Sequence, residues 1–92
     1  MILTVTPNPC VDKTLFTGPI ELGAKIRAPR CTCIAGGKGC NVSRAIKAMG
    51  GDTVAMVLVG GPTGRHVVDM LEKQDGVPTV PVWVDGFTRT IT

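Results

Sequence analysis

Aromatic residues are scarce in this sequence of 92 residues, which has no tyrosine and a single histidine. Its three aromatic side chains, Phe16, Trp83 and Phe87, are too few to stack with successive bases of a single-stranded nucleic acid. Runs of adjacent basic residues are absent too, although the net charge is +3, so we expect no nucleic-acid partner. A small anionic ligand explains the positive balance equally well.

Long hydrophobic runs are also lacking. The longest wholly apolar run, Val54 to Val59, is far too short to span a bilayer. The first residues, MILTVTPNP, contain neither the basic region nor the cleavage site of a secretory signal. We therefore expect a soluble, cytoplasmic protein with no membrane partner.

Four cysteines, at positions 10, 31, 33 and 40, raise the question of disulfides or a metal. Disulfides are not expected without a secretory context. A structural zinc site usually shows paired cysteines separated by two to four residues, and the only close pair here is the tighter Cys31-x-Cys33. The pattern favours buried free thiols and no metal ligands.

The first third of the chain is typical of short strands. Residues 1–6 are rich in β-formers and are stopped by Pro7-Asn8-Pro9, so Asp12 is expected just beyond the end of a strand. Residues 12–30 mix β-formers with glycine and proline, which indicates partly exposed strands joined by turns, as in a flap. Residues 31–35 form another expected strand, which leads into a glycine-rich loop.

That loop, residues 35–41 (AGGKGCN), has the chemistry of an anion site. Glycines let backbone N–H groups approach a ligand, a helix N-terminus is electropositive, and Lys38 adds a full charge. Asn41 is the expected N-cap of the following helix, which ends at Gly50-Gly51. The apolar face of this helix repeats with helical spacing at Val42, Ala45, Ile46 and Met49.

Known glycine motifs fit this loop poorly. A nucleotide P-loop would need glycine where Thr32 stands and serine or threonine where Gly39 stands. A dinucleotide-binding fingerprint would need glycine in place of Val42. Residues 36–39 match the G-x-x-G of RNA-binding KH domains, but that loop joins two helices and here a strand precedes it. A phosphate site and a plain strand-to-helix turn with a solvated lysine both remain open.

The second half predicts an α/β arrangement. Residues 53–59 are apolar without alternation, as in a parallel strand covered on both faces. Val67, Val68 and Leu71 mark a second helix ending near Asp75-Gly76, and alternating strands and helices imply right-handed crossovers. Residues 80–84 and 87–92 flank Asp85-Gly86, a strong β-hairpin signal.

Several spaced motifs occur in one order: TPNPCVD (6–12), ELGAKIR (21–27), AGGKGCNVSRAIKAMGG (35–51), VGGPTGRHVVDML (59–71) and FTRTI (87–91). Together they resemble the pfkB, or ribokinase-like, carbohydrate kinases, in the sugar-phosphate kinase branch of phosphofructokinases and tagatose-6-phosphate kinases. The resemblance implies that residues 1–92 are the N-terminal portion of a three-layer α/β sandwich, with a small lid of strands at about 12–30 and 79–92. It implies transfer of the γ-phosphate of ATP to a hydroxyl of a phosphorylated ketohexose.

The resemblance assigns substrate contacts residue by residue. Asp12 would accept hydrogen bonds from sugar hydroxyls, and Gly37 and Asn41 would contact the sugar through backbone and amide. Lys38 and Arg89 would hold the phosphate already on the substrate, the arginine as a fork and the lysine as a point charge.

Lys25 and Arg27 are implied to reach the substrate phosphate from the neighbouring subunit of a dimer clasped through the lid strands. A solvated pair of charges on an exposed strand is the competing interpretation. His66 has no matching nucleophile or acid nearby in the sequence and is expected to be an ordinary surface residue. Trp83 is expected to pack in the lid or against a strand face.

Catalytic parts of the family are missing from the sequence. The resemblance places Mg²⁺ and phosphate at an N-x-x-E stretch and the catalytic base in a G-A-G-D loop, and G-A-G-D does not occur here. We therefore expect no catalytic residue, no ATP or Mg²⁺ site and no turnover in the isolated chain, which is expected to be a fragment. The alternative is a stand-alone, non-catalytic sugar-phosphate-binding protein. A cut sheet would leave a bare edge and an uncovered apolar face.

Overall fold

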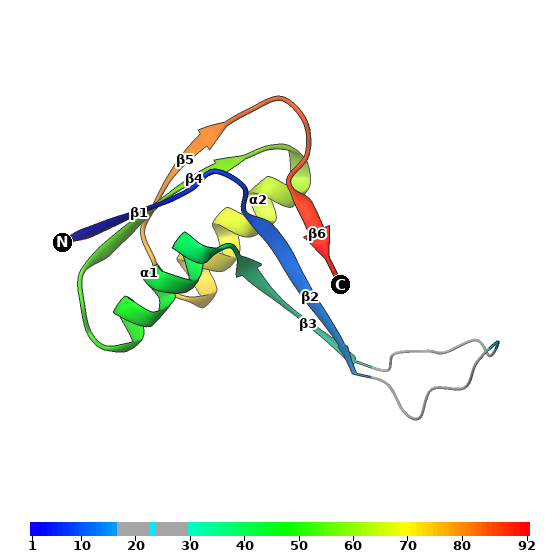
Figure 1. Cartoon of the computed structure of the whole chain (residues 1–92), viewed down its shortest axis with the longest axis horizontal. Coiled ribbons are helices and arrows are strands. Elements are labelled where there is room, and N and C mark those ends of the chain that lie inside the picture. Colours follow the sequence, from blue (N-terminus) through cyan, green and yellow to red (C-terminus); the bar gives the residue numbers. More distant parts are fainter. Residues whose placement is uncertain (17–22, 24–29) are drawn as a thin grey trace.

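The chain forms two three-stranded sheets and two helices in a computed structural model that describes residues 1–16, 23 and 30–92 (Figure 1). The first sheet has the order β1-β4-β5 and the second the order β3-β2-β6. Helix α2 continues directly into a π-helical turn, η1. The elements in chain order are β1 (Ile2–Thr6), β2 (Cys10–Phe16), β3 (Arg30–Gly36), α1 (Lys38–Ala48), β4 (Thr53–Val59), α2 (Gly61–Asp69), η1 (Met70–Gln74), β5 (Thr79–Trp83) and β6 (Arg89–Ile91).

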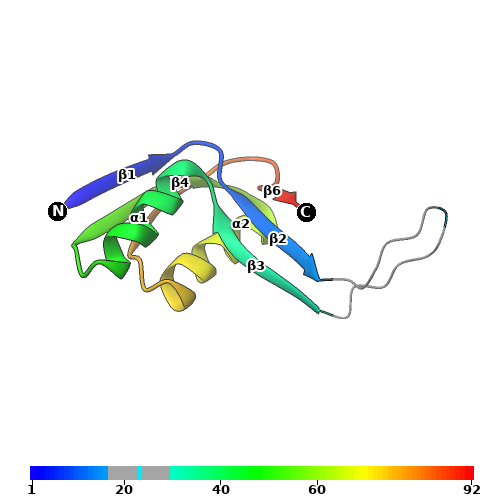
Figure 2. The same ribbon diagram turned by 60° about the horizontal axis from the view of Figure 1, so that its bottom comes forward.

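The expected alternation of parallel strands and helices is confirmed. β1, β4 and β5 are mutually parallel, and both helices lie on the same side of their sheet (Figures 1 and 2). The core lies between this side and the helices, with Leu71 and Val77 fully buried. Along β4 the side chains alternate, and the buried ones are Thr53, Ala55, Val57 and Val59. The prediction that this strand is covered on both faces is therefore wrong, because the helices of the described part cover one face.

The opposite face of the first sheet is apolar and open in the described part of the chain. Register places its side chains in rows that run across the three strands. Leu3 and Val5 are about half exposed, as are Val80 and Val82. The expected uncovered apolar face is thus confirmed for the described residues. The rows on this open face are formed by Leu3 and Val54, by Val5, Met56 and Val80, and by Leu58 and Val82.

Helix α1 begins earlier than expected. Its N-cap is Gly37, and the backbone N–H of Asn41 already donates an intrahelical bond to the Gly37 carbonyl at 2.9 Å. The prediction of Asn41 as the N-cap is therefore wrong. The helix ends as expected, since Gly51 N–H donates to the Ile46 carbonyl and Gly50 takes a positive φ of 79°.

The buried face of α1 is small and polar, not the predicted apolar stripe. Cys40 and Ser43 are fully buried, whereas Val42 and Met49 are 49% and 80% exposed. Ser43 lies between Thr4 of β1 and Thr53 of β4, with oxygen–oxygen distances of 2.7 and 3.0 Å. Short side chains allow the helix to lie close to the sheet, which the apolar spacing alone did not indicate.

The direction of these buried hydrogen bonds follows from counting donors. The Thr53 hydroxyl donates to the Ile2 carbonyl at 2.8 Å, so its single hydrogen is used. Ser43 must then donate to Thr53, and Thr4 must donate to Ser43. This series of hydrogen bonds joins α1 to β1 and to β4.

The predicted hairpin around Asp85-Gly86 is wrong. β5 pairs with β4 in the first sheet, and β6 pairs with β2 in the second, both in parallel. The lid range expected at 79–92 is therefore divided between two sheets. The connection is held by the end of β4 instead, because Val84 N–H donates to the Val59 carbonyl and Thr88 N–H donates to the Gly60 carbonyl, each at 2.9 Å.

In the described part of the chain all four cysteines are free. Cys10 and Cys40 are buried as expected. Cys31 is exposed, and it lies near the start of β3, opposite Leu15 near the end of β2. Neither helix described here has the length and apolar character needed to cross a membrane.

Candidate functional site

Asp12 and Arg89 are brought together by the second sheet. Asp12 is the third residue of β2, and its register partners are Ile34 of β3 and Ile91 of β6. Arg89 is paired with Cys10, two residues before Asp12 on the same strand. Because side chains alternate along a strand, Asp12 and Arg89 project from the same face. The expectation that Asp12 lies beyond a strand end is wrong, since β2 begins at Cys10.

The glycine-rich loop lies against the turn between β1 and β2. A Cβ atom at Gly37 would lie 2.6 Å from the Thr6 Cγ2 atom and 3.5 Å from the Pro9 Cα atom. Gly37 also has a φ of +122°, which side chains rarely adopt. Asn8, in the same turn, accepts a 3.4 Å hydrogen bond from Arg89 Nη2 through its carbonyl. The turn therefore lies between the loop and Arg89.

The N-terminus of α1 is open in the described part of the chain, where no side chain caps it. Lys38 is exposed at the first helical position. Unpaired backbone N–H groups and the helix dipole attract anions, and Lys38 adds a positive charge beside them. This end of the helix therefore has the chemistry to bind a phosphate.

Burial raises the pKa of the Cys40 thiol, which lies in the first turn of α1, and a hydrogen bond to the Thr6 hydroxyl partly offsets this effect. The Cys40 Sγ and Thr6 Oγ1 atoms are 3.7 Å apart. The thiol therefore stays protonated near neutral pH and donates to Thr6. It is a packing group under the loop and has none of the character of a nucleophile.

Asn41 and Arg44 form a pair on α1. Arg44 Nη1 donates to Asn41 Oδ1 at 3.0 Å, and Arg44 Nε donates to Asp75 Oδ2 at 3.0 Å. Arg44 Nη2 donates to the carbonyl of Ala35, the residue that precedes the glycines. The guanidinium thus contacts both ends of the loop.

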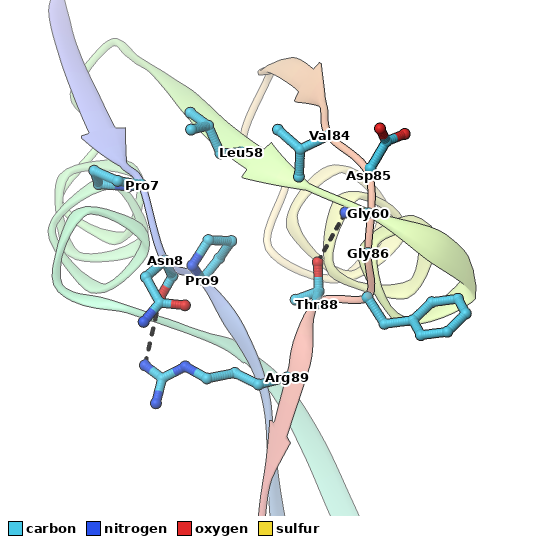
Figure 3. A pocket seen from close by; sticks show the side chains of 11 residues that line it. Pro7, Asn8, Pro9, Leu58, Gly60, Val84, Asp85, Gly86, Thr88 and Arg89 are labelled. Atoms are coloured by element: carbon cyan, nitrogen blue, oxygen red, sulfur yellow. Dashed lines mark hydrogen bonds between the residues drawn. The ribbon is translucent and has the colours of Figure 1, made fainter.

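Thr88 fixes the start of β6 next to Arg89. Its hydroxyl accepts a hydrogen bond from Gly60 N–H at 3.0 Å (Figure 3). Its carbonyl accepts one from the Thr63 hydroxyl at 2.6 Å. Its own N–H donates to the Gly60 carbonyl. Thr88 therefore holds the strand that carries Arg89 against the N-terminus of α2.

The substitution Thr88→Val is expected to destabilise the protein by about 1–3 kcal/mol, because it removes the acceptor of the buried Gly60 N–H while keeping the side-chain shape. Thr88→Ser keeps the hydroxyl and is the matched control, expected to cost less. Urea denaturation measures both. Equal stability of Thr88→Val and the unchanged protein would contradict this role.

A small pocket of about 160 Å³ lies beside Arg89, and the side chain of Arg89 points toward Asn8, another lining residue (Figure 3). It lies between the β1–β2 turn, the end of β4 and the β5–β6 connection. Its lining consists of Pro7, Asn8, Pro9, Leu58, Gly60, Val84, Asp85, Gly86, Phe87, Thr88 and Arg89. Ligand pockets are usually at least about 300 Å³, so this one has room for only part of a small molecule.

The structure thus brings together most of the predicted site residues it describes. Gly37 and Arg89 lie on either side of the β1–β2 turn, and Asp12 shares a sheet face with Arg89. Of the described candidates only Arg89 lines the pocket. Lys25 and Arg27 lie outside the described residues.

Other predicted and missed residues are placed as follows. His66 is exposed, as expected, and Trp83 ends β5 with the Arg65 guanidinium 4.8 Å from its ring centre. Sequence reasoning missed Arg44 and Thr88. Both fall inside quoted motifs, and their polar side chains next to Asn41 and Arg89 would have been the signal.

Comparison with protein-family models matches residues 5–92 to the pfkB family carbohydrate kinase. The chain is 43% identical to a 1-phosphofructokinase of Haloferax volcanii over 93 residues, covering 100% of this chain and 30% of that protein. It is 36% identical to the ATP-dependent 6-phosphofructokinase isozyme 2 of Escherichia coli, covering 96% of this chain and 28% of that protein.

Among solved structures, the chain is similar to the crystal structure of phosphofructokinase-2 from Escherichia coli in complex with fructose-6-phosphate. The TM-score is 0.88 at 36% sequence identity, and the match covers 97% of this chain and 29% of that chain. The sequence therefore spans less than a third of the length of these relatives, and the likeness extends over nearly all of it.

Proposed function

The chain belongs to the pfkB family of carbohydrate kinases, and from this membership we propose that it is the acceptor-binding part of an ATP-dependent sugar-phosphate kinase. The acceptor is a phosphorylated ketohexose, a fructose or tagatose phosphate. The observation that carries the proposal is the placement of Asp12 and Arg89 on one sheet face beside the open, lysine-bearing end of α1. A carboxylate for hydroxyls and cations for a phosphate match the two ends of such a sugar.

Each group has a distinct task in this proposal. Arg89 binds two phosphate oxygens with its fork, and Lys38 adds a point charge together with the N–H groups of α1. Asp12 accepts hydrogen bonds from sugar hydroxyls and so orients the ring. Gly37 lets the backbone approach the sugar, and Asn41 contacts it through its amide. Binding energy spent on the phosphate then positions the hydroxyl that is to react.

The donor side of the reaction is proposed to lie outside this sequence. Among the described residues no three His, Cys, Asp or Glu side chains gather as a metal site. The family resemblance assigns these parts to N-x-x-E and G-A-G-D segments.

A homodimer through the second sheet is part of the proposal. Three apolar side chains on the face that carries Asp12, namely Phe16, Ile34 and Ile91, are each about 40% exposed. A second copy on this face would cover them and bring its own Lys25 and Arg27 to the site. Sedimentation velocity measures this association directly.

Kinase activity tests the proposal. The protein at its natural length, mixed with ATP and Mg²⁺, is expected to phosphorylate at least one of fructose 6-phosphate, fructose 1-phosphate and tagatose 6-phosphate in preference to fructose. The 92-residue chain alone is expected to show no turnover. Tight binding of a sugar phosphate without turnover at natural length would favour the alternative, a non-catalytic sugar-phosphate-binding protein. The absence of both binding and turnover would contradict the kinase proposal and the binding-protein alternative alike.

A further inference from the structure

Arg44 uses every nitrogen of its guanidinium on a different part of the fold. Nε contacts Asp75 after η1, Nη1 contacts Asn41 on α1, and Nη2 contacts the Ala35 carbonyl at the end of β3. The Arg44 side chain is 27% exposed and that of Asp75 is 10% exposed, so the pair is partly shielded from water. A planar fork with donors in fixed directions holds its partners in one geometry.

The contact with Asn41 fixes which way its amide points. A guanidinium only donates hydrogen bonds, so the group that faces Arg44 must be the acceptor Oδ1. The Nδ2 group, with two N–H donors, is then directed away from Arg44. Asn41 is exposed, and its backbone N–H is already bonded to the Gly37 carbonyl. What the residue offers a ligand is therefore a pair of side-chain donors.

Arg44 also joins the two ends of the glycine-rich loop. Ala35 precedes the glycines and Asn41 follows them, and both are bonded to the same guanidinium. These two bonds thus restrict the span of the loop, whose glycines by themselves allow many conformations. A loop held in this way loses less conformational freedom when a ligand binds.

We propose that Arg44 is a positioning residue for the acceptor site: it turns the amide of Asn41 so that only donors face the ligand, and it holds the loop at its bound span. This inference rests on the proposed function, because it takes the ligand to be a sugar phosphate whose oxygens accept from Nδ2. Arg44 acts through Asn41 and does not itself touch the ligand.

A double-mutant cycle tests the proposal in the protein at its natural length, by calorimetric titration with fructose 6-phosphate, fructose 1-phosphate and tagatose 6-phosphate without nucleotide. Arg44→Lys keeps the charge but lacks the fork that contacts Asp75, Asn41 and Ala35 together, and is expected to weaken binding about tenfold. Asn41→Ala is expected to weaken it at least as much. The double variant is expected to bind no worse than Asn41→Ala, because Arg44 has then nothing to orient.

Asp75→Asn is the matched control, since it weakens the ion pair of Arg44 without changing the contact with Asn41. Its affinity is expected to stay within about threefold of the unchanged protein. The inference is overturned if Arg44→Lys binds the sugar phosphate as tightly as Asp75→Asn does. It is also overturned if the losses of binding free energy caused by Arg44→Lys and by Asn41→Ala add in full in the double variant. If the unchanged protein binds none of the three sugars, the proposed function itself fails, which is a different result.

A second measurement decides the case in which Arg44→Lys does not fold. The side-chain amide signals of Asn41 in a nitrogen–proton correlation spectrum are identified by their disappearance in Asn41→Ala. Adding the tightest-binding sugar phosphate to the unchanged protein is expected to shift both amide protons. Signals that stay in place while the ligand binds overturn the inference.

Discussion

Replacing Arg89 with glutamine is expected to weaken the binding of a sugar phosphate at least about a hundredfold, because a charge-assisted fork to the phosphate is lost. Among the described residues, the hydrogen bond of its guanidinium is the long one to the Asn8 carbonyl, at 3.4 Å. Most of its donors therefore remain available to a ligand beside the pocket that Arg89 lines. Calorimetric titration with fructose 6-phosphate measures the loss.

Two further variants separate the fork from the charge. Arg89→Lys keeps the charge and is expected to recover only part of the affinity, since an ammonium cannot bind two oxygens in the same planar geometry. Arg65→Gln removes the same charge from an arginine that lies over the Trp83 ring, outside the pocket lining, and is expected to bind normally. Equal losses in Arg89→Gln and Arg65→Gln would show that net charge, and not this site, attracts the ligand.

Replacing Gly39 with alanine is expected to destabilise the protein by about 1–3 kcal/mol through overpacking. A Cβ atom there would lie 2.2 Å from Thr6 Oγ1 and 3.1 Å from the Val5 carbonyl oxygen, so α1 would have to move away from β1. Gly39 is not among the residues with positive φ, which means that the cost comes from contact and not from backbone strain. Denaturant unfolding measures the free energy.

A rescue experiment tests this cause. Thr6→Ala removes the side chain that the new methyl group meets, so Gly39→Ala combined with Thr6→Ala is expected to lose less stability than the two single losses added together. Rescue is expected to be partial, because the Val5 backbone stays in place. Full additivity of the two changes, or an unchanged stability of Gly39→Ala, would contradict the close packing of α1 on β1.

Much of the fold was predictable because its signals are local. The strand at β1, the apolar strand at β4, the loop and the Gly50 helix end all follow from residues close in sequence. The hairpin prediction was wrong because Asp85-Gly86 indicates only a turn. The segment between β5 and β6 is instead bonded to the end of β4 through the N–H groups of Val84 and Thr88. The start of α1 was predicted wrongly because the glycine-rich segment is already part of the helix start, with Gly37 as N-cap and the Asn41 N–H bonded to its carbonyl.

The candidate site divides in the same way. Asp12, Gly37 and Arg89 were found from motifs, and the structure adds that a sheet register and a turn bring them close. Arg44 and Thr88 stand near Asn41 and Arg89 in the sequence, but the distant partners that they bind could not be found from spacing. Gly60 and Thr88 are 28 residues apart, and Arg44 and Asp75 are 31 apart, so these contacts exist only after folding.

Calorimetric titrations of the protein at its natural length compare the binding of fructose 6-phosphate, fructose 1-phosphate and tagatose 6-phosphate with that of fructose. At least one phosphate ester is expected to bind about a hundredfold or more tighter than fructose, and Arg89→Gln is expected to remove most of this preference. Binding of fructose as tight as that of every phosphate ester, or a preference that Arg89→Gln leaves intact, would contradict the claim that this chain holds a sugar phosphate.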